Sequence, residues 1–190
     1  NTLLHAAAFT SPPQVEKNPI RALEANIVGT SNVVKLCAQF NAKVVYVSTD
    51  YVFRGERGLY VEDDDLHPVN KYAWSKLGGE CAVRLYDNSL IIRTSFGPNV
   101  FPYPKAFIDQ WTSRQSVRLI AEKVVTLLQS EIMGVVHIGG ERRTVHDYAC
   151  SQNPKTSVGE LSIDDVTFSV PRDTSLNCER FNSRFNESTK

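Results

Sequence analysis

The sequence predicts an α/β protein with a doubly wound parallel sheet and a smaller C-terminal lobe. Short apolar runs without polar alternation, such as Val44–Val47, suit strands that are covered on both faces. Segments with helical spacing separate these runs along the 190 residues, and this alternation is typical of a parallel sheet. Hydrophobic residues make up 42% of the chain and charged residues 22%, as in globular proteins.

The charge balance excludes several classes of partner. Basic and acidic residues both number 21, so no overall positive field attracts nucleic acid or a membrane surface. No apolar run approaches the ~20 residues that a membrane span needs. The four cysteines are widely spaced and form no C-x-x-C pair, which predicts no metal site and a reducing, cytoplasmic location. The acidic run 62–65 is expected to be a solvated face.

The first half of the chain predicts two strands around a long helix. The opening Thr2–Ala8 has the pattern of a buried strand entered in mid-domain, so we expect a front portion to be missing. Asn18 suits a helix cap and Pro19 the first helical position. Apolar residues with helical spacing continue to Phe40, and the β-branched run Val44–Val47 follows as a strand.

Further elements predict where the two lobes divide. Helices are expected at about 69–86, 117–129 and 144–150, and strands at 90–92 and 135–138. Residues 1–98 are expected to form the C-terminal half of a dinucleotide-binding domain. Residues 99–190, which begin near a cluster of prolines, are expected to form mainly a substrate lobe, with 117–139 returning to the first sheet.

Tyr72 and Lys76 carry the strongest chemical signal. They stand four residues apart on a predicted helix, so the phenol and the ammonium share one face. A tyrosine with a pKa near ~10 is a poor acid–base catalyst at neutral pH, and a nearby positive charge lowers that value. Such a pair suits proton transfer to or from an alcohol or ketone.

The neighbouring segments place this pair beside a cleft. Ser48-Thr49-Asp50 ends one predicted strand, and Ala6-Ala7-Ala8 ends the strand before it. Ligands of parallel α/β sheets lie beyond the carboxyl ends of the strands. Small side chains there leave room for a flat cofactor, and a hydroxyl can bind a reacting oxygen.

These motifs resemble the extended short-chain dehydrogenase/reductases, in particular the dTDP-4-dehydrorhamnose reductase branch. The matching stretches are HAAAFT, EANIVGTSNVVKLC, VYVSTDYVFRG, PVNKYAWSKLGGE, IIRTSFG and GVVHIGG. The resemblance implies a Rossmann-type fold and a catalytic triad of Thr49, Tyr72 and Lys76. It implies NADPH or NADH as cofactor, bound by Ala6, Ala7, Ala8, Asn26, Ser48, Tyr72, Lys76, Arg93 and Thr94. It implies a nucleotide-sugar substrate near Thr10, Asp50, Tyr51 and Phe96.

The implied reaction is the reduction of a keto group on a nucleotide-linked deoxysugar. The alternatives are an epimerase or 4,6-dehydratase, or a non-catalytic NAD(P)-binding regulatory subunit on the same fold. Dehydratases place an acid after the Thr-Asp pair, whereas Tyr51 follows Asp50 here. Phe96 stands where tryptophan is common, which leaves the sugar open, and a homodimer is left open as well.

The sequence differs from the family pattern in ways that lead to further predictions. The glycine-rich phosphate loop and the ribose-reading residue are absent, which leaves the choice between NADH and NADPH open. We therefore expect a chain that begins at Asn1 to be poorly soluble and to bind dinucleotide weakly. Arg142 and Arg143 are expected in a solvated turn, with a diphosphate grip as the alternative, and Trp74 is expected to pack against its helix.

Overall fold

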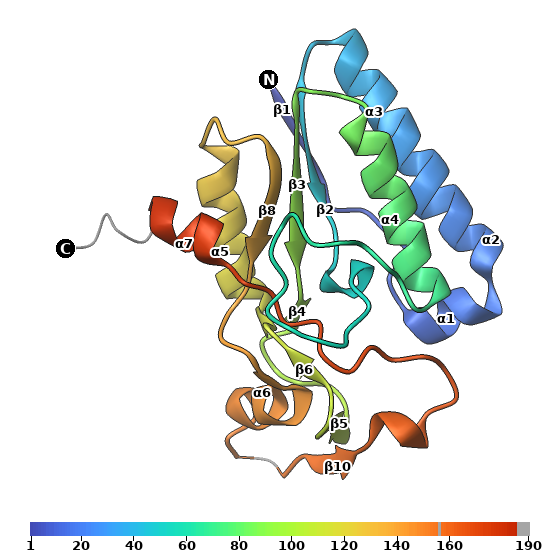
Figure 1. The fold of residues 1–190 in the computed structure, drawn as a ribbon, viewed down its shortest axis with the longest axis vertical. Helices are drawn as coiled ribbons and strands as arrows, with labels where there is room; N and C mark the ends of the chain where they lie inside the picture. The colour runs from blue at the N-terminus through green and yellow to red at the C-terminus, as the bar shows by residue number, and fades with distance from the viewer. Residues whose placement is uncertain (156, 186–190) are drawn as a thin grey trace.

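The structure is a computed structural model that describes residues 1–155 and 157–185 (Figure 1). Its centre is a four-stranded sheet in the order β1-β2-β3-β8, and every neighbouring pair is parallel. The strands are β1 (Thr2–His5), β2 (Lys43–Val47), β3 (Ser89–Thr94) and β8 (Gly134–Ile138). The predicted α/β class with a parallel sheet is confirmed.

Helices cover both faces of this sheet (Figure 1). One face carries α1 (Pro12–Lys17), α2 (Pro19–Ala22), α3 (Gly29–Gln39) and α4 (Lys71–Arg84). The other face carries α5 (Val117–Leu128) and α7 (Glu179–Phe185). Because α5 leads into β8, residues after the first lobe return to the main sheet.

Successive residues of one strand pack on opposite faces of the sheet. Val45 and Ile92 belong to the apolar cluster under α5, whereas Val44, Tyr46 and Ile91 belong to the cluster under α3 and α4. All five side chains are at most 1% exposed. A strand covered on both faces needs apolar residues at every position, which explains why these runs show no alternation.

The predicted helix after Asn18 forms as three joined segments. The Asn18 side chain caps α2 by accepting a hydrogen bond from the Arg21 backbone N–H at 3.3 Å, and Pro19 follows at the first helical position. Residues Leu23–Val28 then form a π-helix, labelled η1, before α3 begins. The wider π turn contains the buried Asn26, and such turns occur frequently at functional sites.

The second lobe is small and built from short pairs of strands. They are β4 (Phe96–Gly97) with β7 (Gln115–Ser116), β5 (Lys105–Phe107) with β10 (Gly159–Leu161), and β6 (Trp111–Thr112) with β9 (Arg143–Thr144). Helix α6 (Val145–Gln152) begins at a capping box formed by Thr144 and Asp147. Its residues Tyr148 and Ala149 pack with Phe101 and Ala106 in a separate apolar cluster.

The chain after the 3₁₀ turn η3 (Ile163–Asp165) runs back to the main sheet. Leu176 and Cys178 pack against Phe53 and Tyr60 of the loop that follows β2. Gly58, with φ +72°, faces the Asp173 side chain so closely that a Cβ would collide with its carboxylate. No helix in the described part of the chain is long and apolar enough to span a membrane.

Candidate active site

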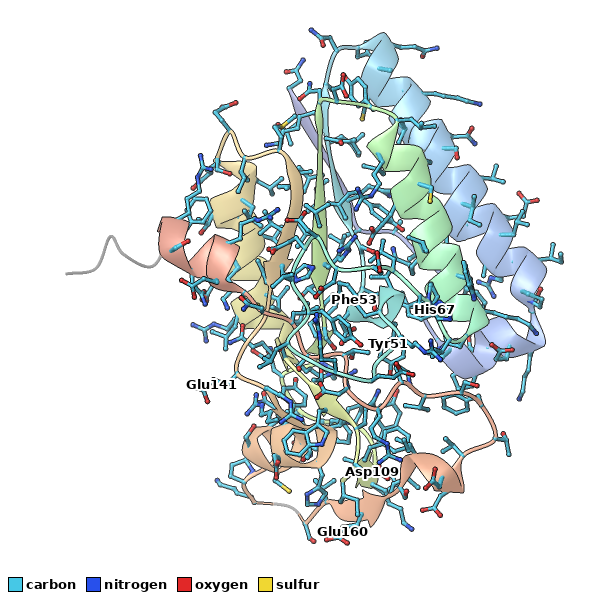
Figure 2. The ribbon with its side chains drawn as sticks, viewed as in Figure 1. Tyr51, Phe53, His67, Asp109, Glu141 and Glu160 are labelled. Carbon is cyan, nitrogen blue, oxygen red and sulfur yellow. The ribbon has the colours of Figure 1, made fainter. Side chains whose placement is uncertain are left out.

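Three loops meet at the carboxyl edge of the sheet. Ala6–Thr10 follow β1, Ser48–Asp50 follow β2, and Ser95 follows β3. The three strands are adjacent and parallel, so these loops lie side by side. Figure 2 shows Tyr51 and Phe53 between the sheet and the lobe that carries Asp109 and Glu160. The sequence prediction of a common edge agrees with this arrangement.

Tyr72 lies at this edge, in the first turn of α4. Asn70 caps the helix by accepting a hydrogen bond from the Ala73 backbone N–H at 2.9 Å. Burial raises the pKa of Tyr72 above its usual value, and the charges of Asp50 and Tyr51 raise it further. A hydrogen bond with the Thr49 side chain and the positive charge of Arg114 oppose that rise. At neutral pH the phenol therefore keeps its proton.

Lys76 lies one turn further along α4 and is 3% exposed. Its Nζ donates to the Val47 carbonyl at 2.8 Å and stands 4.2 Å from the centre of the Tyr46 ring. Burial lowers the pKa of Lys76 from 10.5 to about 8, against the opposing charge of Glu80. The expected lowering of the Tyr72 pKa by Lys76 stays a prediction.

Thr49 and Asp50 connect the first lobe to the C-terminal segment. Thr49 Oγ1 caps the 3₁₀ turn η2 (Asp50–Val52) by accepting from the Tyr51 N–H, and it donates to Asp50 Oδ1 at 3.2 Å. Asp50 Oδ2 accepts from Thr174 Oγ1 at 2.7 Å and from Thr112 Oγ1 at 3.5 Å. Burial raises the pKa of Asp50, and the Thr174 hydrogen bond opposes the rise. Three hydroxyls thus hold a buried carboxyl beside Tyr72.

Tyr51 packs against the phenol ring of Tyr72. Its ring lies edge-on to that of Tyr72, with 6.1 Å between the ring centres. Gln110 Nε2 donates to the Tyr51 hydroxyl at 2.6 Å, which anchors this ring to the second lobe. Burial raises the pKa of Tyr51, so it is neutral at the pH where Tyr72 would act.

Three predicted cofactor residues make their polar contacts inside the protein. Asn26 Nδ2 donates to Phe9 O at 3.0 Å and to Ser75 Oγ at 2.8 Å, while its Oδ1 accepts from the Phe9 N–H. Ser48 Oγ donates to Glu80 Oε1 at 2.5 Å. Asn26 therefore holds the loop after β1 against α4. These contacts brace the site from inside the protein, and contact of Asn26 and Ser48 with a cofactor stays a prediction.

Arg93 is the third of these residues and is fully buried. Its Nη2 pairs with Glu80 Oε2 at 2.9 Å, and its Nη1 donates to the Glu62 carbonyl at 3.1 Å and to His137 Nε2 at 3.4 Å. Since Arg93 can only donate, His137 is neutral with its proton on Nδ1, which donates to the Tyr60 carbonyl. Burial, assisted by Arg93, lowers the pKa of His137 to about 3. The Arg93 side chain is thus engaged within the protein, and its contact with a cofactor stays a prediction.

Other predicted contacts are accessible or lack a partner. Ala6, Ala7 and Thr10 are exposed and Ala8 is half-buried, while Phe96 is 47% exposed at the start of β4. Among the described residues, the Thr94 Oγ1 atom is buried with no hydrogen-bond partner. An orphaned hydroxyl at the last residue of β3 and small exposed side chains beyond β1 fit a flat, polar cofactor at this edge. The contacts themselves stay predictions.

Sequence reasoning missed several residues of this site. Glu80 stands four residues after Lys76, and helical spacing on the same face was the signal that could have found it. Arg114, Gln110 and Thr174 come from irregular segments far along the chain, where no local pattern points to the site. The acidic run also differs from its prediction, because Glu62 is buried and accepts from the His137 N–H at 2.9 Å.

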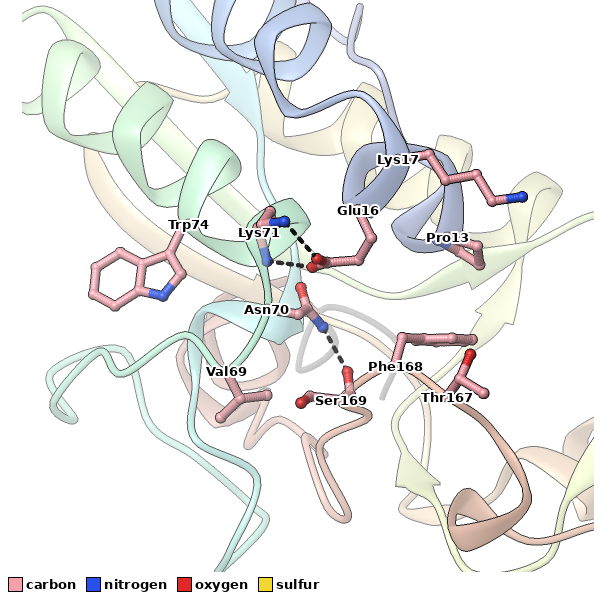
Figure 3. A pocket seen from close by; sticks show the side chains of 10 residues that line it. All are labelled: Pro13, Glu16, Lys17, Val69, Asn70, Lys71, Trp74, Thr167, Phe168 and Ser169. Carbon is pink, nitrogen blue, oxygen red and sulfur yellow. Dashed lines mark hydrogen bonds and ion pairs between the residues drawn. The ribbon is translucent and has the colours of Figure 1, made fainter.

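A pocket of about 620 Å³ opens beside the start of α4 (Figure 3). Lys71 and Glu16 form an ion pair of 3.0 Å on its wall, and Asn70 Nδ2 donates to the Ser169 carbonyl at 3.0 Å. Trp74 also lines it and is 55% exposed, so the expectation that Trp74 packs against its helix is wrong. The pocket adjoins the helix turn of Tyr72 but does not include the Tyr72 side chain among its lining residues.

Residues 1–126 match the RmlD substrate binding domain family. The chain belongs to this family. The predicted resemblance to the dTDP-4-dehydrorhamnose reductase branch of the extended short-chain dehydrogenase/reductases is thereby confirmed.

Relatives of the RmlD-like chain fall into two groups. Methionine adenosyltransferase 2 subunit beta of Bos taurus is 28% identical over 95% of this chain and 64% of its own length. dTDP-4-dehydrorhamnose reductase of Aggregatibacter actinomycetemcomitans is 33% identical over 65% of this chain and 44% of its own length. The chain thus spans less than two thirds of either relative.

Solved structures share the RmlD-like fold. A hypothetical dTDP-4-dehydrorhamnose reductase from Sulfolobus tokodaii superposes with a TM-score of 0.86 and 30% identity, covering 96% of this chain and 72% of that one. The Bacillus anthracis dTDP-4-dehydrorhamnose reductase in complex with NADP has a TM-score of 0.83 at 24% identity, covering 96% of this chain and 72% of that one. The second likeness shows the fold alone.

Proposed function

We propose that this protein reduces a keto group on a nucleotide-linked deoxysugar with NADPH or NADH, as dTDP-4-dehydrorhamnose reductases do. One observation carries the proposal: at the carboxyl edge of the sheet, Tyr72 in the first turn of α4 lies against Tyr51, which follows Thr49 and Asp50, with Lys76 one helical turn away. The family and the relatives named as reductases support the same reading.

The chain's own residues would position the substrate and move a proton. A bound nicotinamide cofactor supplies the hydride. Thr49 Oγ1 would hold the keto oxygen, and the Tyr72 hydroxyl would donate its proton to the alkoxide that forms there. Burial favours this direction, because it keeps the phenol protonated until charge develops on the substrate. The Lys76 ammonium would contribute positive charge next to the cofactor ribose.

The direct test is consumption of the reduced cofactor. NADH and NADPH are each mixed with the intact protein and a panel of nucleotide-linked 4-keto sugars, and absorbance of the reduced nicotinamide is followed. A reductase oxidises one molecule of NADH or NADPH for each molecule of product, whereas an epimerase or dehydratase regenerates its cofactor in every turnover. If product forms without net oxidation of the reduced cofactor, the protein is an epimerase or a dehydratase and the reductase proposal is wrong.

A regulatory subunit is the second candidate function. The observation that favours it is the match to methionine adenosyltransferase 2 subunit beta along 95% of the chain. Cofactor binding with no turnover on any nucleotide sugar, in the intact protein, would select this candidate over the reductase.

Activity is expected to fall as the pH rises through about 8. Lys76 has a pKa lowered to about 8, so its ammonium is present below that pH and is lost above it. Since kcat/KM reports groups of the free enzyme, its alkaline limb should fall between about pH 7.5 and 9. In Lys76→Met the remaining activity should lack this limb. A wild-type profile that stays level over this range would contradict the role of Lys76.

Ala7 tests the cofactor position without disturbing the core. Because Ala7 is exposed beyond β1, Ala7→Leu should fold normally but obstruct a flat ligand lying on this loop. We expect the Kd for the nicotinamide cofactor to rise by about tenfold, a change of about 1.4 kcal/mol, in fluorescence titration. Ala121→Leu, also exposed but on α5, is the matched control. If the two variants bind the nicotinamide cofactor with equal affinity, the cofactor does not lie against Ala7.

A further inference from the structure

The buried ammonium of Lys76 has no carboxylate bonded to it. Lys76 Nζ donates to the Val47 carbonyl at 2.8 Å and lies 4.2 Å from the centre of the Tyr46 ring. In the part of the chain that the structure describes, Lys76 forms no ion pair. A buried cation without a counter-charge is costly, because burial favours the neutral amine. The charge of Lys76 therefore depends on groups beyond direct contact.

Glu80 is a carboxylate held in one position. It lies one helical turn after Lys76 on α4, and its side chain is fully buried. Its Oε1 accepts from Ser48 Oγ at 2.5 Å and from Arg93 Nε at 3.1 Å, while its Oε2 accepts from Arg93 Nη2 at 2.9 Å. Both oxygens thus have donors, and the side chain cannot turn without losing them. Glu80 places a fixed negative charge between α4 and the sheet.

Lys76 and Glu80 bind successive residues at the end of β2. Val47, which accepts from Lys76, is followed directly by Ser48, which donates to Glu80. Side chains four residues apart share one face of a helix. The ammonium and the carboxylate therefore occupy the same buried layer between α4 and β2.

Gly79 allows α4 to lie this close to β2. A Cβ at Gly79 would collide with the Tyr46 hydroxyl and would stand 2.8 Å from the Asn26 carbonyl. The Tyr46 hydroxyl donates to the Lys76 carbonyl at 3.3 Å, which fixes its ring against the helix. The ring face that meets the Lys76 ammonium is therefore held in place by the same helix.

The charge of Glu80 opposes the effect of burial on Lys76. Burial lowers the pKa of Lys76, and Glu80 raises it. His5 is neutral at pH 7, because burial and the charge of Lys76 lower its pKa, and Tyr46 is neutral because burial raises its pKa. The titratable and charged groups on the elements around Lys76 are His5 of β1, Tyr46 of β2, Asp50 and Tyr51 of η2, Tyr72 and Glu80 of α4, and Arg93 of β3.

We propose that Glu80 is a positioning residue for the reduction: its fixed carboxylate keeps Lys76 protonated and holds the ammonium between the Val47 carbonyl and the Tyr46 ring. The assignment rests on the function proposed above, in which Lys76 acts beside the cofactor. Glu80 acts through Lys76 and contacts neither cofactor nor substrate. A purely structural role, in which Glu80 only neutralises Arg93, predicts no effect on Lys76.

The titration of Lys76 is measured directly, without turnover. The intact protein is labelled with ¹³C at the lysine ε-carbons, and the Lys76 signal, identified by its absence in Lys76→Met, is followed by NMR against pH. Glu80→Leu combined with Arg93→Met removes both charges and should move the titration to lower pH by about one pH unit, at the low end of the usual effect of a nearby opposite charge. In Glu80→Gln the titration should move further, because the Arg93 charge remains.

Matched variants separate this role from support of the fold. The double variant leaves no charge unpaired, so a lowered Lys76 titration in that folded protein does not come from lost structure. Glu122→Gln removes a carboxylate that is 60% exposed on α5 and should leave the Lys76 titration unchanged. Glu80→Asp keeps the charge on a shorter side chain and should bring the titration back toward the wild-type pH. If Lys76 titrates at the wild-type pH in the double variant, the proposal is wrong.

The pH profile of turnover gives a second readout. In the double variant the alkaline limb of kcat/KM should move together with the NMR titration, while kcat/KM at about pH 6 stays within about threefold of wild type. If the limb stays at the wild-type pH although the Lys76 titration moves, Glu80 has no role in the reduction. If the intact protein reduces no nucleotide sugar, the reductase proposal fails, and the NMR titration still decides whether Glu80 controls the charge of Lys76.

Discussion

Replacing Tyr72 by Phe is expected to reduce kcat by about 10²–10⁴-fold, the usual contribution of a positioned proton donor. The substitution removes one hydroxyl and leaves the ring, which packs edge-on against Tyr51. Helix α4 should therefore form normally, and the Kd for the nicotinamide cofactor should stay close to the wild-type value. The measurement is steady-state oxidation of the reduced cofactor with the nucleotide sugar that the panel identifies.

A matched variant shows whether the loss is local. Tyr103→Phe also removes a phenol hydroxyl, but Tyr103 is 66% exposed and lies edge-on against Phe101 in the second lobe. It should keep wild-type kcat. If Tyr72→Phe keeps the wild-type kcat, Tyr72 is not the proton donor and the mechanism proposed for the reduction is wrong.

The largest expected loss of stability comes from Glu80→Gln. Glu80 and Arg93 form an ion pair in which both side chains are fully buried. The neutral amide leaves the Arg93 guanidinium without a counter-charge in the core, and breaking such a pair costs about 3–5 kcal/mol. For a domain of this size we expect Tm to fall by about 6–20 °C in thermal unfolding followed by circular dichroism.

Two comparisons make the role of this pair measurable. Arg118→Ala breaks an exposed pair with Glu122 and should cost less than about 1 kcal/mol. The double variant Glu80→Leu with Arg93→Met removes both charges, and it should recover most of the stability lost in Glu80→Gln. If Glu80→Gln unfolds at the wild-type temperature, the buried pair does not support the fold as argued here.

The sheet and its carboxyl edge could be predicted from the sequence because their patterns are local. The run Val44–Val47 is apolar at every position, and its burial on both faces accounts for that pattern. Asn18 followed by Pro19 begins a helix because a cap and a first-turn proline act over only three or four residues. Tyr72 and Lys76 were found in the same way, from a spacing of one helical turn.

The partners of the site residues could not be predicted, because they come from distant segments. Asp50 accepts from Thr174, which lies 124 positions further along the chain. Trp74 is 55% exposed and lines a pocket together with residues from distant segments, such as Pro13 and Phe168, which no local pattern could indicate. Arg93 forms a fully buried ion pair with Glu80, a partner that no local pattern identified, and its contact with a cofactor stays a prediction.

The sequence by itself determined the α/β class, the order of strands and helices along the first lobe, and the tyrosine–lysine spacing on one helix. These features depend on interactions within one or two helical turns or strands, so the local pattern of residue types is sufficient to predict them. Only the tertiary structure decided which groups set the pKa of Tyr72, that Asn26 and Ser48 support the site from inside, and that Arg114 reaches it from the second lobe. Burial and charge act through space, and which residues share that space is decided by the packing of segments far apart in the chain.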